Sequence, residues 1–281
     1  MEGLTLVVSA ASTWLLDLLV ALLIGFSLLR PAASDAPRFR LWPWLGLLGA
    51  DYLIYLLGRV SAMSGQSLAG ALPAVGMVIS QTHFGMMWGI GAAGWLAMLG
   101  LASSGPATMR RLWPLALLVF VYSHAATGHV ADAGFVSLAA LVHIGHLLAT
   151  GAWAGSVFVF LLRHHRSSDA FSHGEARQLS VLAAWAMVLV LASGVLNAWR
   201  MLHGTQAPWS EPYGLLLIAK TVLVVVALTL GTINRLGVLP QLLSGKTKAR
   251  PRFLSLLYPE AVVFVLLFGL AALLSATSPP G

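Results

Sequence analysis

Four of the nine histidines lie between residues 123 and 146, in apolar surroundings. The stretch begins Ser-His-Ala-Ala-Thr-Gly-His, which contains His124 and His129, and continues after a short turn into an apolar run with His143 and His146. An ionisable side chain inside a membrane costs at least about 2.5 kcal/mol, so its presence is a functional hypothesis by default. Imidazole is also the commonest protein metal ligand and suits copper, zinc, nickel and iron. These residues predict a metal or haem site in a membrane-embedded helical hairpin.

A fifth histidine lies in a similar context. His83 is followed three residues later by Met86, as His143 is followed by His146, and each histidine is expected about nine residues into its span. A spacing of three places both side chains on one helix face. Thioethers favour Cu(I), and imidazole accepts either copper state. The predicted metal ligands are His83, Met86, Met87, His124, His129, His143 and His146.

The composition requires a membrane protein. Of 281 residues, 58% are hydrophobic and 9% are charged, whereas soluble domains carry about 25% charged residues. In a bilayer the backbone must satisfy its own hydrogen bonds, so apolar runs of this length are helices. We therefore expect one all-α, polytopic integral-membrane domain over residues 1–281, with about eight transmembrane helices. The predicted spans are 7–29, 42–63, 75–102, 113–130, 134–162, 178–202, 213–235 and 258–276.

The basic residues predict the orientation of these spans. Lysine and arginine concentrate in the connections after the first, third, fifth and seventh spans, whereas the opposite connections hold only Arg59 and Arg200. Basic loops face the cytoplasm, so both termini are expected on the outer side, which is the periplasm in a Gram-negative cell. The high pI is therefore explained by basic residues in cytoplasmic loops beside the lipid bilayer. No nucleic-acid partner is predicted. His124 and His143 then share a similar depth, and their site opens outward.

Further ionisable residues lie within the predicted spans. Asp17 and Asp51 belong to the first two, Lys220 to the seventh, and Glu260 begins the last on its inner side. One interpretation is structural: Arg59 and Lys220 neutralise the aspartates in the bundle interior. The other is a polar pathway that leads inward from the histidines. Both interpretations remain open.

Glycine spacing predicts close helix packing at two places. Gly85 and Gly89, and likewise Gly151 and Gly155, have the small-xxx-small spacing that lets membrane helices approach each other closely.

Two other kinds of metal chemistry compete with copper. A zinc hydrolase is disfavoured because His-Glu-x-x-His is missing, and we do not expect an enzyme. Haem b is the stronger rival. Two-haem membrane cytochromes place histidines about 13–14 residues, or about 20 Å, apart on one helix, whereas the spacings here are three and five. That permits one haem at most, for example between His124 and His143.

The fifth span resembles a known family. His143-Ile-Gly-His-Leu-Leu-Ala-Thr-Gly-Ala-Trp153 is similar to the opening of the CopD copper-resistance membrane domain, and the similarity continues through Asn197, Lys220 and Asn234-Arg235. The CopD-like region covers about residues 120–235. The resemblance implies an inner-membrane protein of copper homeostasis that imports copper received from a periplasmic CopC-like partner.

The combined prediction is a multi-pass inner-membrane protein that binds copper at an outward-facing His/Met site and imports it. The alternatives are a haem-binding electron-transfer protein, and a copper-binding or sensing component without transport. The residues expected in a second shell or pathway are Asp17, Asp51, Trp153, Asn197, Lys220 and Glu260.

Overall fold

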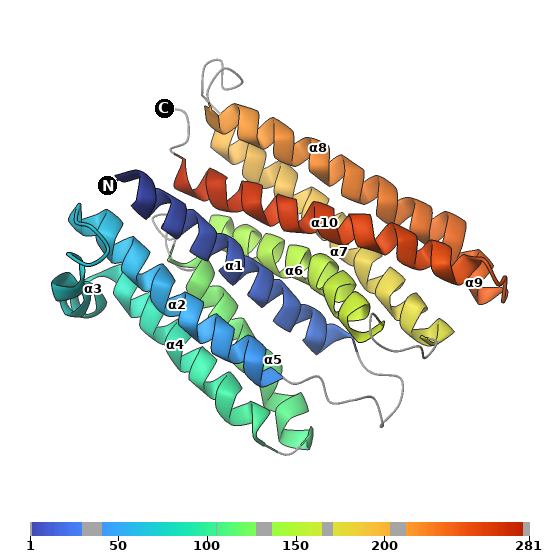
Figure 1. The fold of residues 1–281 in the computed structure, drawn as a ribbon, viewed down its shortest axis with the longest axis horizontal. Coiled ribbons are helices and arrows are strands. Elements are labelled where there is room, and N and C mark those ends of the chain that lie inside the picture. The colour runs from blue at the N-terminus through green and yellow to red at the C-terminus, as the bar shows by residue number, and fades with distance from the viewer. Residues whose placement is uncertain are drawn as a thin grey trace. The chain divides into compact units, whose positions relative to one another are not determined.

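The computed structural model describes residues 2–29, 41–104, 106–127, 137–164, 171–202 and 212–277. Within these ranges every regular element is a helix, which confirms the all-α prediction (Figure 1). The α-helices are α1 (Glu2–Leu28), α2 (Leu41–Ser64), α3 (Val75–Gln81), α4 (His83–Ala102), α5 (Pro106–Ala125), α6 (Leu138–His164), α7 (His173–Leu202), α8 (Pro212–Thr232), α9 (Leu239–Leu243) and α10 (Ala249–Ala276). A 3₁₀ turn, Leu72–Ala74, precedes α3, and a π-helical segment, Ile233–Val238, joins α8 to α9.

Seven stretches of the described chain are long and apolar enough to cross a membrane. They are Thr5–Leu28, Leu41–Ser64, His83–Ala102, Ala140–His164, His173–Arg200, Pro212–Leu243 and Ala249–Ala276. The helical membrane bundle is thus confirmed, but the predicted span 113–130 is not among the seven. Its residues fall largely on α5, which begins earlier, at Pro106, and includes Arg110 and Arg111. These two arginines make α5 less apolar than the other long helices.

The predicted span 75–102 is divided in two. α3 ends at Gln81, and Thr82 is extended, with φ −117° and ψ 153°. Its Oγ1 accepts a hydrogen bond of 3.0 Å from the backbone N–H of Gly85, which caps the start of α4. Gly85 is required here because a Cβ at this position would collide with the backbone of Val78 and Ile79. His83 is therefore the first residue of a helix and does not lie nine residues into a continuous one.

The chain forms two compact units. The N-terminal unit comprises residues 1–20 and 40–148, and the C-terminal unit comprises residues 21–39 and 149–281. The division falls within α1 and within α6, so each of these helices contributes to both units.

Aromatic contacts hold α2, α4 and α5 together in the N-terminal unit. The rings of Tyr52 and Trp88 stack with centroids 5.3 Å apart. The Trp88 indole N–H donates to the Tyr52 carbonyl, and the Tyr52 hydroxyl donates to the Trp88 carbonyl, both at 3.1 Å. Phe120 of α5 packs against Tyr52 at 5.0 Å. These contacts fix the helix that carries His124.

The first and sixth helices touch through glycine in the C-terminal unit. A Cβ at Gly25 or at Gly155 would collide with the backbone of the facing helix, so only glycine allows this approach. Gly151 is also close, since a Cβ there would meet Ile24 at 2.5 Å. The predicted close packing is therefore confirmed at Gly151 and Gly155 but is wrong at Gly89, where a Cβ would meet nothing within 4 Å.

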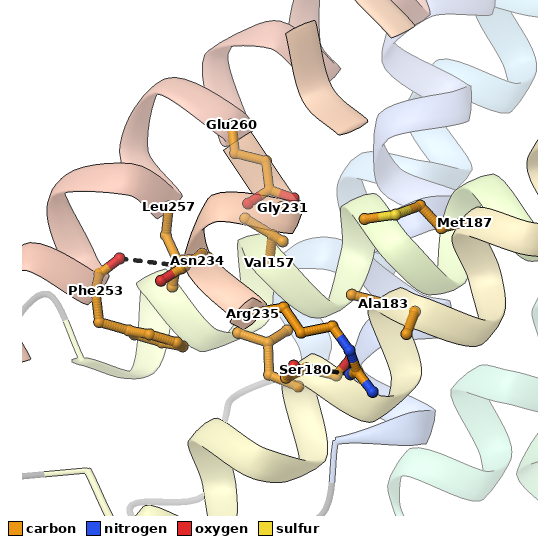
Figure 2. A pocket seen from close by; sticks show the side chains of 12 residues that line it. Val157, Ser180, Ala183, Met187, Gly231, Asn234, Arg235, Phe253, Leu257 and Glu260 are labelled. Atoms are coloured by element: carbon orange, nitrogen blue, oxygen red, sulfur yellow. Dashed lines mark hydrogen bonds between the residues drawn. The ribbon is translucent and has the colours of Figure 1, made fainter. Parts of the chain in front are cut away.

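The π-helical segment directs two adjacent polar residues to different neighbours. The Asn234 amide N–H donates to the carbonyl of Phe253 in α10 at 3.4 Å. The Arg235 guanidinium donates to the carbonyl and Oγ of Ser180 in α7, at 2.6 and 2.9 Å (Figure 2). π-helical turns occur frequently at functional sites, and both residues of this pair line a pocket.

Candidate functional site

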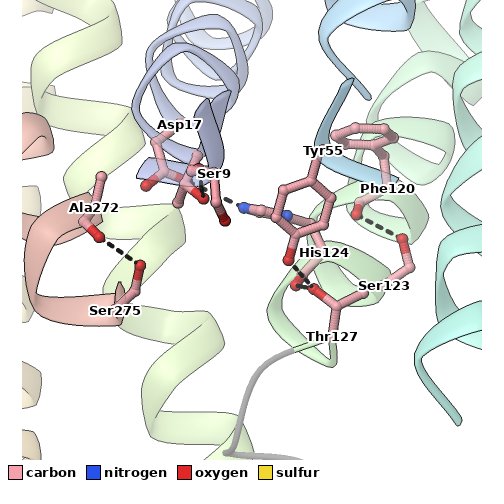
Figure 3. A network of polar contacts seen from close by, with 10 residues as sticks. Ser9, Asp17, Tyr55, Phe120, Ser123, His124, Thr127, Ala272 and Ser275 are labelled. Carbon is pink, nitrogen blue, oxygen red and sulfur yellow. Dashed lines mark hydrogen bonds and ion pairs between the residues drawn. The ribbon is translucent and has the colours of Figure 1, made fainter. Parts of the chain in front are cut away.

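His124 is held by a carboxylate from another helix. Its Nε2 lies 3.1 Å from Oδ1 of Asp17 in α1, and the two side chains are 9% and 12% exposed (Figure 3). The Nδ1 of His124 is buried and has no hydrogen-bond partner within the described residues. The ring is therefore oriented by one nitrogen, while the other is not engaged.

Hydroxyl groups complete the surroundings of His124. The Tyr55 hydroxyl and Thr127 Oγ1 are 2.8 Å apart, and Thr127 donates to the His124 carbonyl at 2.6 Å (Figure 3). Tyr55 also meets the imidazole edge to face, with ring centroids 5.6 Å apart. Thr127 was not among the predicted site residues, although it directly precedes the Gly-His pair that ends the Ser-His-Ala-Ala-Thr-Gly-His stretch.

Asp51 belongs to the same cluster. It is buried, Ser12 donates to its carbonyl oxygen at 3.3 Å, and it interacts electrostatically with His124 and Asp17. Its Oδ2 is buried without a hydrogen-bond partner among the described residues. Asp17, Asp51 and His124 therefore lie within one polar cluster, although they belong to three different predicted spans.

The structural interpretation, in which Arg59 and Lys220 neutralise the aspartates, does not hold for Asp17. Asp17 pairs with His124, and the Arg59 guanidinium lies over the ring of Phe84 at 5.7 Å.

The other predicted ligands are placed as follows. His83 is exposed, and its Nε2 lies 3.0 Å from the carbonyl of Ala126, two residues beyond His124. His143 and His146 are half-buried, one turn apart on α6. Met87 is buried and Met86 is 50% exposed, as expected for neighbours on one helix. His129 lies outside the described residues.

Across the described ranges, no three His, Asp or Glu side chains are grouped so that they could hold a metal ion. The full ligand set remains a prediction.

Two predicted pathway residues meet in the C-terminal unit. The Trp153 indole N–H donates to Glu260 Oε1 at 2.8 Å, and both side chains are 2% exposed. Asn197 on α7 and Lys220 on α8 are half-buried. The sequence named Trp153 and Glu260 individually, but it could not pair them.

A pocket adjoins Glu260 and was not predicted. Its polar lining residues are Ser180, Asn234, Arg235 and Glu260, and the remainder is mostly apolar (Figure 2). The only sequence signal was the adjacent polar pair Asn234-Arg235 at the end of an apolar run. The π-helical geometry that turns this pair toward two different helices has no such signal.

Comparison with known protein families gives a match over part of the chain. Residues 173–274 match the model of the family described as copper resistance protein D, CopD. This confirms the resemblance expected from the sequence. The match covers α7 through most of α10. It shares residues 173–235 with the expected region and extends beyond it to include Glu260, whereas all the predicted histidine ligands lie outside it.

Two curated relatives match over longer stretches. The inner membrane protein YebZ of Escherichia coli (strain K12) is 25% identical over 213 residues, covering 74% of this chain and 73% of the relative. The copper transport protein CutJ of Bacillus subtilis (strain 168) is 26% identical over 251 residues, covering 84% of this chain and 45% of the relative. This chain thus spans less than half the length of CutJ. No solved structure matches.

The localisation follows from these findings together. YebZ is named an inner membrane protein, and the described chain contains seven membrane-length apolar helices. The protein is a multi-pass inner-membrane protein, as predicted.

Proposed function

We propose that this protein is an inner-membrane copper-binding protein of copper homeostasis, which takes copper from the outer face and imports it. The CopD match and the similarity to a protein named for copper transport support the copper assignment. The seven apolar helices supply the membrane scaffold. Copper is the cargo, and a periplasmic CopC-like protein is the proposed donor.

The geometry of His124 carries this proposal. Metal-ligating histidines almost always bind a carboxylate, carbonyl or water through their second ring nitrogen, which fixes the ring and raises its basicity. Asp17 occupies this position on the Nε2 of His124, and the buried Nδ1 is available. A buried ring nitrogen without a partner costs free energy, and a ligand bound to the Nδ1 of His124 would offset that cost.

The remaining ligands and the pathway complete the proposal. The ligands that join His124 are His83, Met86, Met87, His129, His143 and His146. A cation that crosses hydrocarbon needs replacement ligands along its way, since an isolated buried charge is very costly. The residues proposed for the second shell or the pathway are Asp17, Asp51, Trp153, Asn197, Lys220 and Glu260.

Metal analysis of the purified protein, with its absorption spectrum, tests the binding site. We expect copper in the wild type and its loss in His124→Ala. His173→Ala is the matched control, because His173 is exposed at the start of α7. Equal copper in both variants would refute the site, and a Soret band would establish haem b in its place.

Transport is tested in proteoliposomes that enclose a copper chelator. The proposal expects uptake of external copper that is lost in His124→Ala. Copper binding without uptake would leave a binding or sensing component and end the importer assignment.

The proposed orientation is tested with single cysteines, since the chain has none. Ser67 and Ser244 are exposed and lie in connections expected on opposite sides. In intact cells, an impermeant thiol reagent should label Ser67→Cys but not Ser244→Cys. The reverse pattern would place both termini inside.

A further inference from the structure

The pocket beside Glu260 presents a buried carboxyl group with no ion pair to it among the described residues. Glu260 is 2% exposed, and its hydrogen-bond donor in the described part of the chain is the neutral indole of Trp153. An ionised carboxylate in apolar surroundings is costly unless a cation pairs with it. The group must therefore carry a proton or hold a cation.

The charged and polar groups around Glu260 distinguish these two states. Arg235 is the one basic side chain among the lining residues, and its guanidinium is bound to Ser180 in α7. A fixed positive charge in the same pocket disfavours a second cation. From α6 and α8 the groups that face the carboxyl are the neutral Trp153 and Gly231.

Asn234 supplies an independent indication that water or a proton uses this pocket. It is 4% exposed, its Nδ2 donates to the carbonyl of Phe253, and its Oδ1 is buried without a partner within the described chain. Buried polar atoms that find no protein partner are usually satisfied by water. The pocket has a cavity volume of about 30 Å³, which is enough to hold a water molecule.

Gly231 keeps the space next to the carboxyl open. A Cβ at this position would lie 3.3 Å from Glu260 Oε1 and 2.7 Å from the terminal methyl of Met187. The absence of a side chain lets the end of α8 approach Glu260 while leaving room beside it (Figure 2).

We propose that Glu260 is a proton-binding site, which holds a proton at neutral pH and exchanges it with water admitted beside Asn234. In the exchange the O–H bond of the carboxylic acid breaks, the proton joins a water molecule, and the bonding electron pair stays on the carboxylate. A link between this proton and copper movement rests on the proposed function. The proton site itself does not.

Carbodiimide labelling tests the site without copper. A nitrogen of dicyclohexylcarbodiimide takes the proton of a carboxylic acid, and the carboxylate oxygen then bonds to the central carbon to give an O-acylisourea. The acyl group shifts from this oxygen to a nitrogen, which gives a stable N-acylurea adduct without loss of atoms. We probe the purified full-length protein at pH 7.5 and map adducts by mass spectrometry. Glu175 is the internal control because it is a capping-box carboxylate bonded to Ser172.

We expect Glu260 to be labelled at least about tenfold more than Glu175, since only about one in a thousand ordinary glutamates is protonated at this pH. Labelling of Glu175 alone, or of neither, would overturn the proposal. Protection of Glu260 by sodium, but not by choline, would assign the pocket to a metal cation, and protection by Cu(I) would assign Glu260 to the proposed copper pathway. Either result would overturn the proton site.

An infrared difference spectrum provides a second measurement that needs no reagent access. We expect a carboxylic-acid C=O band that shifts in D₂O and is absent in Glu260→Gln. Asn234→Leu should slow the deuterium shift without removing the band, because the acid stays while its route for water is narrowed. A wild type without this band would refute the proton site. A wild type that shows the carboxylic-acid band but takes up no copper in proteoliposomes would instead refute only the transport proposal.

Discussion

The two units each bury a polar centre among apolar helices, but they stabilise it in opposite ways. Around His124 a carboxylate meets a potential cation, and hydroxyls of Tyr55 and Thr127 add hydrogen bonds. Around Glu260 the carboxyl meets a neutral indole, while the nearby Arg235 is bound to Ser180. In the first arrangement the carboxylate meets a second ionisable group, whereas in the second the hydrogen-bond donor to the carboxyl is neutral.

The two polar centres also differ in whether they lie within the part of the chain that matches the CopD family. The imidazole nitrogens that suit copper lie in the N-terminal unit, outside the CopD match, while Glu260 and Asn234 lie inside it. Copper recognition is therefore expected at the histidines, and proton exchange at the part that matches the family. We therefore expect variants at His124 to lose copper binding and variants at Glu260 to lose proton exchange.

Loss of His124 should have the largest effect. His124→Ala is expected to weaken copper binding by more than about 100-fold, because removal of the outer-shell partner of a ligand alone costs about 10–100-fold. Competition with a chelator of known affinity measures the change. If Glu260→Gln loses as much copper as His124→Ala, the distinction between the two centres fails.

Asp17→Asn should weaken copper binding by about 10–100-fold, because the amide can still accept a hydrogen bond from His124 but no longer supplies negative charge. The same chelator competition applies. Thr13→Ala is a control on the same helix, since the Thr13 hydroxyl bonds only locally, to the Ser9 carbonyl. Equal affinities of the two variants would mean that the Asp17 carboxylate does not support a metal ligand.

A side chain at Gly155 should destabilise the C-terminal unit. Gly155→Ala is expected to cost about 1–3 kcal/mol or more, because its Cβ would collide with the α1 backbone. Gly145→Ala is the control on the same helix, as a Cβ there meets nothing within 4 Å. Thermal denaturation in detergent should separate the two. Similar melting temperatures would contradict the glycine contact.

Trp153→Phe should have the smallest effect. It removes the indole donor of Glu260 but keeps an aromatic ring, and membrane-protein hydrogen bonds contribute about 0.6 kcal/mol on average and about 1.7 kcal/mol at most. Denaturant unfolding measures the loss. Carbodiimide labelling should persist, because the proton depends on burial more than on this bond.

The sequence was sufficient for those properties that depend on local composition. Apolar run length identified the helices, and the cost of burying charge identified His124, Asp17, Asp51 and Glu260 as unusual. The predicted span 113–130 was placed by its apolar centre, whereas α5 begins earlier, at Pro106, and includes Arg110 and Arg111; residues 128–130 of this span lie outside the described residues. The break at Thr82 was invisible, because one extended residue does not interrupt an apolar run.

Pairings between distant residues could not be predicted. Asp17 and His124 are 107 positions apart, as are Trp153 and Glu260. Each contact depends on which helices become neighbours and on their rotation, and a single sequence contains neither. The glycine contact was only half-predictable, since spacing indicated that Gly155 is an interface residue but not that Gly25 faces it.

The π-helical segment makes the length of the chain near residue 235 a functional variable. A π-helical turn contains one residue more than the α-helical turn it replaces, so deleting one residue within Ile233–Val238 would restore α-helical winding and move the side chains inside this segment to new angles around the axis. Asn234 and Arg235 could then no longer both reach their present partners, Phe253 and Ser180. Hydrophobicity would hardly change, and the helix would still cross the membrane. Insertions and deletions here should therefore impair function more than most substitutions do, although neither would alter the apolar character of the span.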